Sequence, residues 1–104
     1  MLTVSEIDSL IQRIVGLCNP EKIILFGSYA KGTATMASDL DLLIVKETRL
    51  PMKRRADDLA SIVSGSLIPI DIHVYTPEEV EEYGKEPYTF VHSVLKTGRI
   101  LYSK

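Results

Sequence analysis

Apolar residues return along the chain with the two periodicities that distinguish helices from strands. Between Thr3 and Pro20 they recur at every third or fourth position, which predicts an amphipathic helix that ends before the proline. Thr3 and Glu6 have the spacing of a capping box, so we expect the helix to begin there. The β-branched and aromatic run Lys22 to Phe26, closed by Gly27, predicts a strand that enters a turn.

The middle of the chain predicts two more strands with a helix between them. Asp39 to Val45 and Ile68 to Tyr75 are rich in Leu, Ile and Val, as strands are. Pro51 suits the first turn of a helix, which we expect to continue to the Ser64-Gly65-Ser66 stop. The expected core-facing residues of that helix are Met52, Ala56, Leu59, Ala60 and Val63.

The C-terminal third predicts two helices and one further strand. Thr76-Pro77-Glu78-Glu79 combines an N-cap, a proline in the first turn and a returning glutamate, so a short helix is expected to reach about Tyr83. Pro87 to Thr97 has helical apolar spacing and stops at Gly98. The apolar tail Ile100-Leu101-Tyr102 is a candidate edge strand. This order, αβαβαβαα with an edge strand, predicts a single α/β domain over residues 1–104.

The composition is that of an ordinary soluble domain. The 104 residues are 45% hydrophobic and 25% charged, with a formal net charge of -2. Cys18 is the only cysteine, which excludes a disulfide framework, and its place on the apolar stripe of the first helix favours a buried structural thiol. No apolar stretch approaches the roughly 18 residues of a membrane span and no leader opens the chain. We therefore expect a cytoplasmic protein without membrane association or strong nucleic-acid binding.

Two aspartates interrupt the second predicted strand, and aspartate is a poor strand former. In a strand, Asp39 and Asp41 point to the same face, about 7 Å apart along the chain at a rise of roughly 3.3 Å per residue. In the third strand, alternation places Asp71 and His73 together on the face opposite their apolar neighbours. Mg²⁺ takes one or two carboxylates and completes its coordination with water and substrate phosphates. The pattern predicts a divalent cation site.

The turn before these aspartates has the character of a phosphate site. Gly27 and Ser28 follow a strand and open a short helix, which we expect to give way to a loop by Thr35. In such a turn the backbone N–H groups and the positive end of the helix face outward and receive phosphate. Gly27 allows close approach, Ser28 adds a hydroxyl, and Gly32 can end the helix in a left-handed conformation.

These residues resemble the signature of the DNA polymerase β-like nucleotidyltransferase superfamily. The signature is Gly-Ser, ten residues, Asp-x-Asp and a later acidic residue; here it reads Gly27-Ser28, Tyr29 to Ser38, Asp39-Leu40-Asp41 and Asp71. The stretches GSYAKGTATMASDLDLLIV and IDIHVYTPEE are similar to the minimal nucleotidyltransferases, small proteins often paired with HEPN-domain toxins. The resemblance covers nearly the whole chain and implies a polymerase β-like α/β (α+β) fold, in which helices flank a mixed sheet.

The resemblance also implies roles for individual residues. Gly27 and Ser28 would bind the β and γ phosphates of ATP. Asp39, Asp41 and Asp71 would be the catalytic residues and would coordinate two Mg²⁺ ions, with Asp71 also helping to deprotonate the acceptor. The implied reaction transfers AMP to a hydroxyl, in this group a tyrosine of the partner HEPN toxin, and releases pyrophosphate. The protein would then act as an antitoxin.

Other functions stay open on the sequence. A non-catalytic antitoxin would neutralise its partner by binding alone, and a small-molecule nucleotidyltransferase of the antibiotic-modifying type would use the same motif. Haloacid-dehalogenase phosphatases also carry Asp-x-Asp, but they need Thr or Val where this chain has Leu43. The basic run Lys53-Arg54-Arg55 is interpreted as a solvated face, and His92 as a surface residue.

Overall fold

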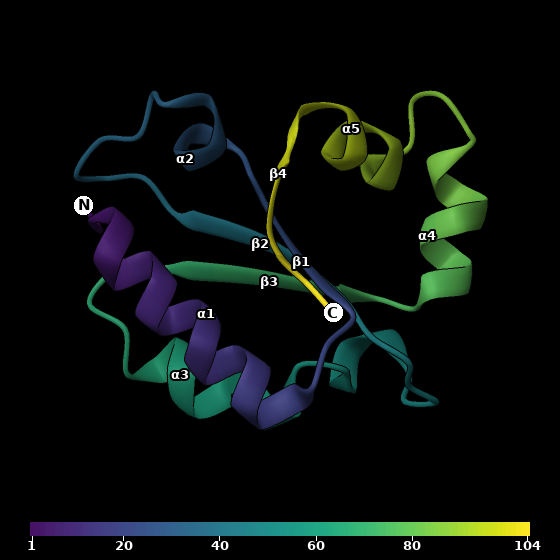
Figure 1. The fold of residues 1–104 in the computed structure, drawn as a ribbon, viewed down its shortest axis with the longest axis horizontal. Coiled ribbons are helices and arrows are strands. Elements are labelled where there is room, and N and C mark those ends of the chain that lie inside the picture. Colours follow the sequence, from purple (N-terminus) through teal and green to yellow (C-terminus); the bar gives the residue numbers. More distant parts are fainter.

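The computed structural model describes residues 1–104, and its centre is a four-stranded sheet with helices on both faces (Figure 1). The strands are β1 (Lys22–Phe26), β2 (Leu40–Val45), β3 (Ile70–Tyr75) and β4 (Arg99–Ser103). The helices are α1 (Val4–Cys18), α2 (Ser28–Lys31), α3 (Ala60–Ser64), α4 (Pro77–Gly84) and α5 (Phe90–Thr97). Two short 3₁₀ turns, Met52–Arg54 and Asp57–Leu59, precede α3. The predicted class, with helices flanking a mixed sheet, is confirmed.

The strand order across the sheet is β3-β2-β1-β4. β1 is antiparallel to both of its neighbours, β2 and β4, whereas β2 and β3 are parallel. The predicted edge strand at the C-terminal end of the chain is therefore confirmed. Because parallel strands cannot be joined by a tight turn, residues 46–69 cross over one face of the sheet and carry α3 on the way.

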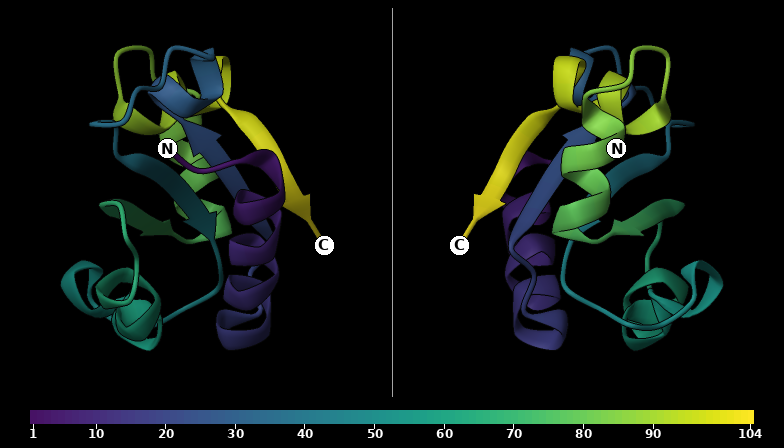
Figure 2. Two further views of the ribbon diagram at one scale, coloured as in Figure 1. Left: turned by 90° about the vertical axis from the view of Figure 1, so that its left-hand side faces the viewer. Right: turned by 90° about the vertical axis from the view of Figure 1, so that its right-hand side faces the viewer.

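Alternation along the strands sends side chains to both faces of the sheet, and each face has its own core. Figure 2 shows α1 and the α3 region on one face and α4 with α5 on the other. The larger core, of 13 buried residues, joins Ile14 of α1 and Leu59 to strand residues such as Leu42. On the other face, Leu43 of β2 packs against Val94 of α5. The site described below lies on this second face.

Polar caps fix where several helices begin. The capping boxes predicted at Thr3 and Thr76 are both present. α5 begins later than predicted, at Phe90, because the Thr89 hydroxyl accepts a hydrogen bond from the His92 N–H and so caps the helix. None of the helices combines the length and the apolar character that crossing a membrane requires.

The prediction of a single helix after Pro51 is wrong. The segment forms the two 3₁₀ turns and the short α3 instead. Met52 is 50% exposed and Val63 38% exposed, whereas Leu59 and Ile62 are 0% and 2% exposed and enter the core. A 3₁₀ turn has three residues and not 3.6, so the apolar positions rotate away from the face that a continuous α-helix would present.

Candidate active site

Three strands each contribute one residue to a row across the sheet, on the face that α5 covers. Phe26 of β1 is the register partner of Asp41 of β2, and Asp41 is the register partner of Asp71 of β3. Neighbouring strands lie about 4.8 Å apart, so the two carboxylates are adjacent. Ile70 and Val74 of β3 belong to the opposite core. The predicted side-chain alternation of β3 is therefore confirmed.

Asp39 precedes β2 and does not lie within it, which corrects the predicted start of that strand. Its charge still acts on its neighbour. Burial raises the pKa of the Asp41 carboxyl above its ordinary value, the negative charges of Asp71 and Asp39 raise that pKa further, and His73 opposes them. The fold thus brings together Asp39, Asp41 and Asp71, which we call the acidic cluster.

Gly27 lies directly against this cluster. Its backbone has φ +73° and ψ −155°, a region that side-chain-bearing residues essentially do not occupy. A Cβ at this position would overlap Oδ2 of Asp41 and lie 3.2 Å from its Cγ. The position therefore requires glycine twice, once for the turn of the backbone and once for the approach of the carboxylate.

The short helix α2 follows Gly27 immediately. The Gly27 carbonyl accepts a hydrogen bond of 3.1 Å from the Lys31 N–H, which closes the helical turn. N–H groups at the beginning of a helix, here from Ser28 onward, have no intrahelical acceptor and can meet an anion. Gly32 ends the helix with φ +74°, as predicted. The turn and the acidic cluster therefore adjoin.

Three aromatic rings stand beside the acidic cluster, and we call Phe26, His73 and Phe90 the aromatic wall. The centroid of Phe90 lies 5.3 Å from that of Phe26 and 4.8 Å from that of His73, and Phe26 and His73 are 5.8 Å apart. His73 Nε2 is 3.2 Å from Asp71 Oδ2. Sequence reasoning treated Phe90 only as an apolar position of a helix, because its contact with β3 depends on how α5 packs.

The acidic cluster lies on an open surface. The side chain of Asp71 is 58% exposed, and none of the five surface hollows of the protein is lined by these aspartates. No three acidic, histidine or cysteine side chains converge closely enough to form a complete metal site. The cluster offers carboxylate oxygens, which suit a hard divalent cation that brings water and phosphate oxygens as its other ligands.

Three further interpretations from the sequence can be compared with the structure. Cys18 is 8% exposed and burial raises the pKa of its thiol, so the buried structural thiol is confirmed. The solvated interpretation of Arg55 is wrong, because its side chain is 11% exposed and binds Glu79 through two hydrogen bonds of 2.6 and 3.3 Å. His92 is half-buried, not on the surface, with Nδ1 2.8 Å from the Gly84 carbonyl oxygen.

Comparison with known proteins connects this geometry to a family. The model of the family described as "Polymerase beta, Nucleotidyltransferase" matches residues 8–104. A Methanocaldococcus jannaschii protein named "Putative protein adenylyltransferase" is 36% identical over 84 residues, which cover 79% of this chain and 78% of that protein.

Solved structures share the fold at lower identity. A crystal structure of a toxin-antitoxin with AMP-PNP gives a TM-score of 0.65 at 20% identity, over 93% of this chain and 73% of that chain. A mutant of the toxin-antitoxin MntA-HpeT gives a TM-score of 0.62 at 20% identity, over 100% of this chain and 75% of that chain. With the family match over nearly the whole chain, these findings show that the protein belongs to the polymerase β nucleotidyltransferase family and is a nucleotidyltransferase.

Proposed function

We propose that the protein is a Mg²⁺-dependent protein adenylyltransferase that transfers AMP from ATP to a tyrosine hydroxyl of a HEPN-domain toxin, and so acts as an antitoxin. The observation behind the proposal is the position of Asp41, which lies between Gly27 and Asp71. A phosphate turn and paired carboxylates are the two components that nucleotidyl transfer needs. The relative named as a protein adenylyltransferase supports a protein acceptor, and the toxin-antitoxin structures of the same fold support the kind of partner.

The turn after β1 would bind the phosphates of ATP. The N–H groups at the start of α2 and the Ser28 hydroxyl would donate hydrogen bonds to the β and γ phosphates. Because Gly27 has no Cβ, the phosphate chain can approach the backbone beside Asp41. The phosphates then add negative charge next to three carboxylates, and this combination requires a cation.

Asp39, Asp41 and Asp71 would hold two Mg²⁺ ions, with phosphate oxygens as further ligands. Mg²⁺ bound there would neutralise the triphosphate and would stabilise the attacking and leaving oxygens. Asp41 has a raised pKa partly because two carboxylates face it, and a cation among the three would remove this repulsion.

The acceptor would approach from the exposed end of the cluster. Asp71 belongs to β3 and more than half of its side chain is exposed, so the hydroxyl of a second protein can reach it. The acceptor oxygen forms a bond to the α-phosphorus while the bond between the α and β phosphates breaks. Asp71 accepts the hydroxyl proton, and pyrophosphate leaves.

The decisive experiment is incubation of the purified protein with Mg²⁺, α-labelled ATP and its candidate HEPN-domain partner, followed by intact mass spectrometry of the partner. We expect a mass gain of AMP on the partner and its loss in Asp39→Asn/Asp41→Asn. The matched control is Asp8→Asn/Asp57→Asn, which removes the same charge from exposed positions outside the cluster.

The same variants separate the alternatives. If Asp39→Asn/Asp41→Asn neutralises the partner as well as the unmodified protein does, the enzymatic account is contradicted. That result would indicate an antitoxin that acts by binding alone. Transfer of AMP to small hydroxyl compounds but not to the partner would indicate a small-molecule enzyme.

A further inference from the structure

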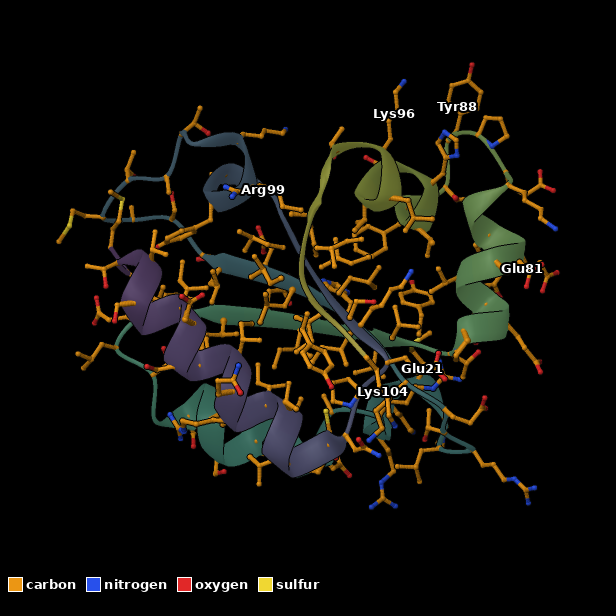
Figure 3. The ribbon with its side chains drawn as sticks, viewed as in Figure 1. Glu21, Glu81, Tyr88, Lys96, Arg99 and Lys104 are labelled. Atoms are coloured by element: carbon orange, nitrogen blue, oxygen red, sulfur yellow. The ribbon has the colours of Figure 1, made fainter.

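Phe90 differs from the other sheet-facing residues of α5. Val91 and Val94 are buried at 1% and 2% exposure, whereas Phe90 is 39% exposed although its ring contacts Phe26 and His73. The Phe90 ring meets Phe26 edge-on, at an interplanar angle of 79°, its centroid also lies 6.1 Å from that of Tyr75, and part of the side chain is open to solvent. Figure 3 shows that Tyr88 and Lys96, in contrast, point away from the sheet.

The aromatic wall borders the acidic cluster along the sheet. Phe26 is the register partner of Asp41, so this end of the wall stands beside the central carboxylate. At the other end, His73 lies two residues after Asp71 on the same face of β3, and its Nε2 is 3.2 Å from Asp71 Oδ2. A ring that lies against the wall therefore has its edge next to the carboxylates.

Hydrogen bonds between α4 and α5 hold Phe90 in place. The hydroxyl of Thr89 donates to the Tyr83 carbonyl at 2.8 Å and accepts from the His92 N–H at 3.1 Å. The His92 ring bonds the Gly84 carbonyl through Nδ1 at 2.8 Å. A wall that is fixed before binding loses little conformational entropy when a ligand arrives.

We propose that the aromatic wall binds the ring of the acceptor tyrosine, with Phe90 as the main stacking residue; this inference rests on the proposed function. The phosphate turn follows β1, at one end of the row across the sheet, and Asp71 lies on β3 at the other end. An acceptor whose hydroxyl gives its proton to Asp71 can place its ring beside His73, whose Nε2 lies 3.2 Å from that carboxylate, and beside Phe90. An aromatic acceptor gains stacking there that serine or threonine cannot.

Two substitutions test this assignment with matched chemistry. Phe90→Leu keeps an apolar side chain that can pack on α5 but removes the flat ring. Tyr83→Leu is the control, because Tyr83 is equally exposed at 39% and contacts Tyr75 at 6.2 Å, but lies outside the wall. Thermal unfolding of both variants shows whether each remains folded.

The first measurement is equilibrium binding by NMR of the ¹⁵N-labelled protein with Mg²⁺ and a non-hydrolysable ATP analogue. N-acetyl-tyrosinamide is the probe and N-acetyl-leucinamide is the comparison ligand; adenosine is added to a separate sample without the ATP analogue, so that a nucleobase site is free to bind it. We expect tyrosinamide to shift the Phe90 and His73 signals and to bind about 2- to 10-fold more weakly to Phe90→Leu, the range of one aromatic pair. Tyr83→Leu is expected to bind as the unmodified protein does.

The second measurement is AMP transfer to the partner, with KM determined separately for acceptor and ATP. We expect Phe90→Leu to raise the acceptor KM by a similar factor without changing the ATP KM. The proposal is overturned in favour of a nucleobase site if Phe90→Leu changes only the ATP KM. It is overturned in the same way if adenosine, and not tyrosinamide, shifts the Phe90 signals. Equal losses in Phe90→Leu and Tyr83→Leu overturn it as well.

The two measurements also separate this inference from the proposed function. Tyrosinamide binding at Phe90 without AMP transfer to any tyrosine supports the wall and contradicts the proposed reaction. If the unmodified protein transfers AMP and Phe90→Leu has the same acceptor KM, the reaction is supported. The proposal that the aromatic wall binds the acceptor ring is then overturned.

Discussion

The carboxylate of Asp41 occupies the space beside Gly27 in which any other residue would place its Cβ. The turn after β1, whose backbone angles only glycine adopts, and the central carboxylate of the acidic cluster therefore determine each other's position. Loss of the glycine strains the backbone of this turn and displaces the carboxylate. Gly32, which has a positive φ but no neighbouring side chain, shows what alanine costs without the collision.

Gly27→Ala is predicted to abolish AMP transfer and to destabilise the protein by more than the roughly 1–2 kcal/mol of a left-handed alanine, because ψ −155° lies outside the left-handed helical region and the new methyl group also collides with Asp41. Gly32 has φ +74° and ψ 18°, the left-handed helical conformation, and nothing lies within 4 Å of the Cβ that Gly32→Ala would add. Gly32→Ala is therefore expected to lose only the roughly 1–2 kcal/mol that a left-handed alanine costs, and to keep transfer activity. Urea unfolding and AMP transfer of both variants check this; equal activity losses would contradict it.

Asp41→Asn is predicted to stabilise the metal-free protein at pH 7 while removing activity. The pKa of Asp41 is higher in the folded protein than in the unfolded chain, so ionisation disfavours folding. The penalty is absent below the unfolded pKa of about 3.8 and complete above the higher folded pKa. The gain should be about 0.2–1 kcal/mol, typical of facing pairs on neighbouring strands, and should vanish towards pH 3.

Unfolding with urea in the presence of a chelator, at several pH values, measures this gain. The conservative substitution Asp8→Asn, on the exposed side of α1, is the control and is expected to show no such pH dependence. A destabilised Asp41→Asn at pH 7 would contradict the destabilisation of the ionised carboxylate by burial and by its two negative neighbours.

Glu79 is predicted to give the protein an acid-sensitive contact. Hydrogen bonding from Arg55 lowers the pKa of Glu79 first of all, bonding from Thr76 lowers it further, and burial opposes both. The contribution is therefore complete above the unfolded pKa near 4.5 and is lost as the pH falls through the lower folded pKa. Glu79→Gln should cost about 1.5–3 kcal/mol at pH 7, and progressively less in acid.

Glu81→Gln on the same helix is the control, because Glu81 is 73% exposed and pairs only with Lys85, at 3.6 Å. The effect of Glu81→Gln on the free energy of unfolding should stay near zero both at pH 7 and in acid. If the two glutamine variants differed little at pH 7, the Arg55 contact would not be a significant source of stability.

The 3₁₀ turns before α3 can be tested by a pair of alanine substitutions. Leu59 is fully buried, so Leu59→Ala should cost about 2–5 kcal/mol. Met52 is 50% exposed, and Met52→Ala should stay within about 0.5 kcal/mol. Chemical unfolding checks both values. Similar losses at the two positions would favour the continuous helix that the sequence predicted.

Local patterns were sufficient for most of the fold. Thr3 and Thr76 marked helix starts, and the alternation around Asp71 gave the correct face of β3, because caps and strand periodicity depend only on neighbouring residues. The rotation of Met52 out of the core depends on the crossover packing against α1, which no local pattern contains.

For the candidate site, the sequence predicted the type and spacing of the residues but not their surroundings. The register of three strands brings Asp41 next to both Gly27 and Asp71. The partners of Arg55 and Phe90 come from distant elements, Glu79 of α4 and the rings on β1 and β3, so their roles required the tertiary structure. The chemical roles of the acidic residues stay predictions.

The parallel pairing of β2 with β3 also has a consequence for the order in which the protein folds. The β1–β2 pair joins segments that are near in sequence, whereas Asp71 meets Asp41 only after residues 46–69 have crossed the sheet. Contacts of long sequence separation form slowly, because loop closure must precede them. We therefore expect the Asp41–Asp71 pair to form after the β1–β2 pair, so that a partly folded chain does not yet possess the site.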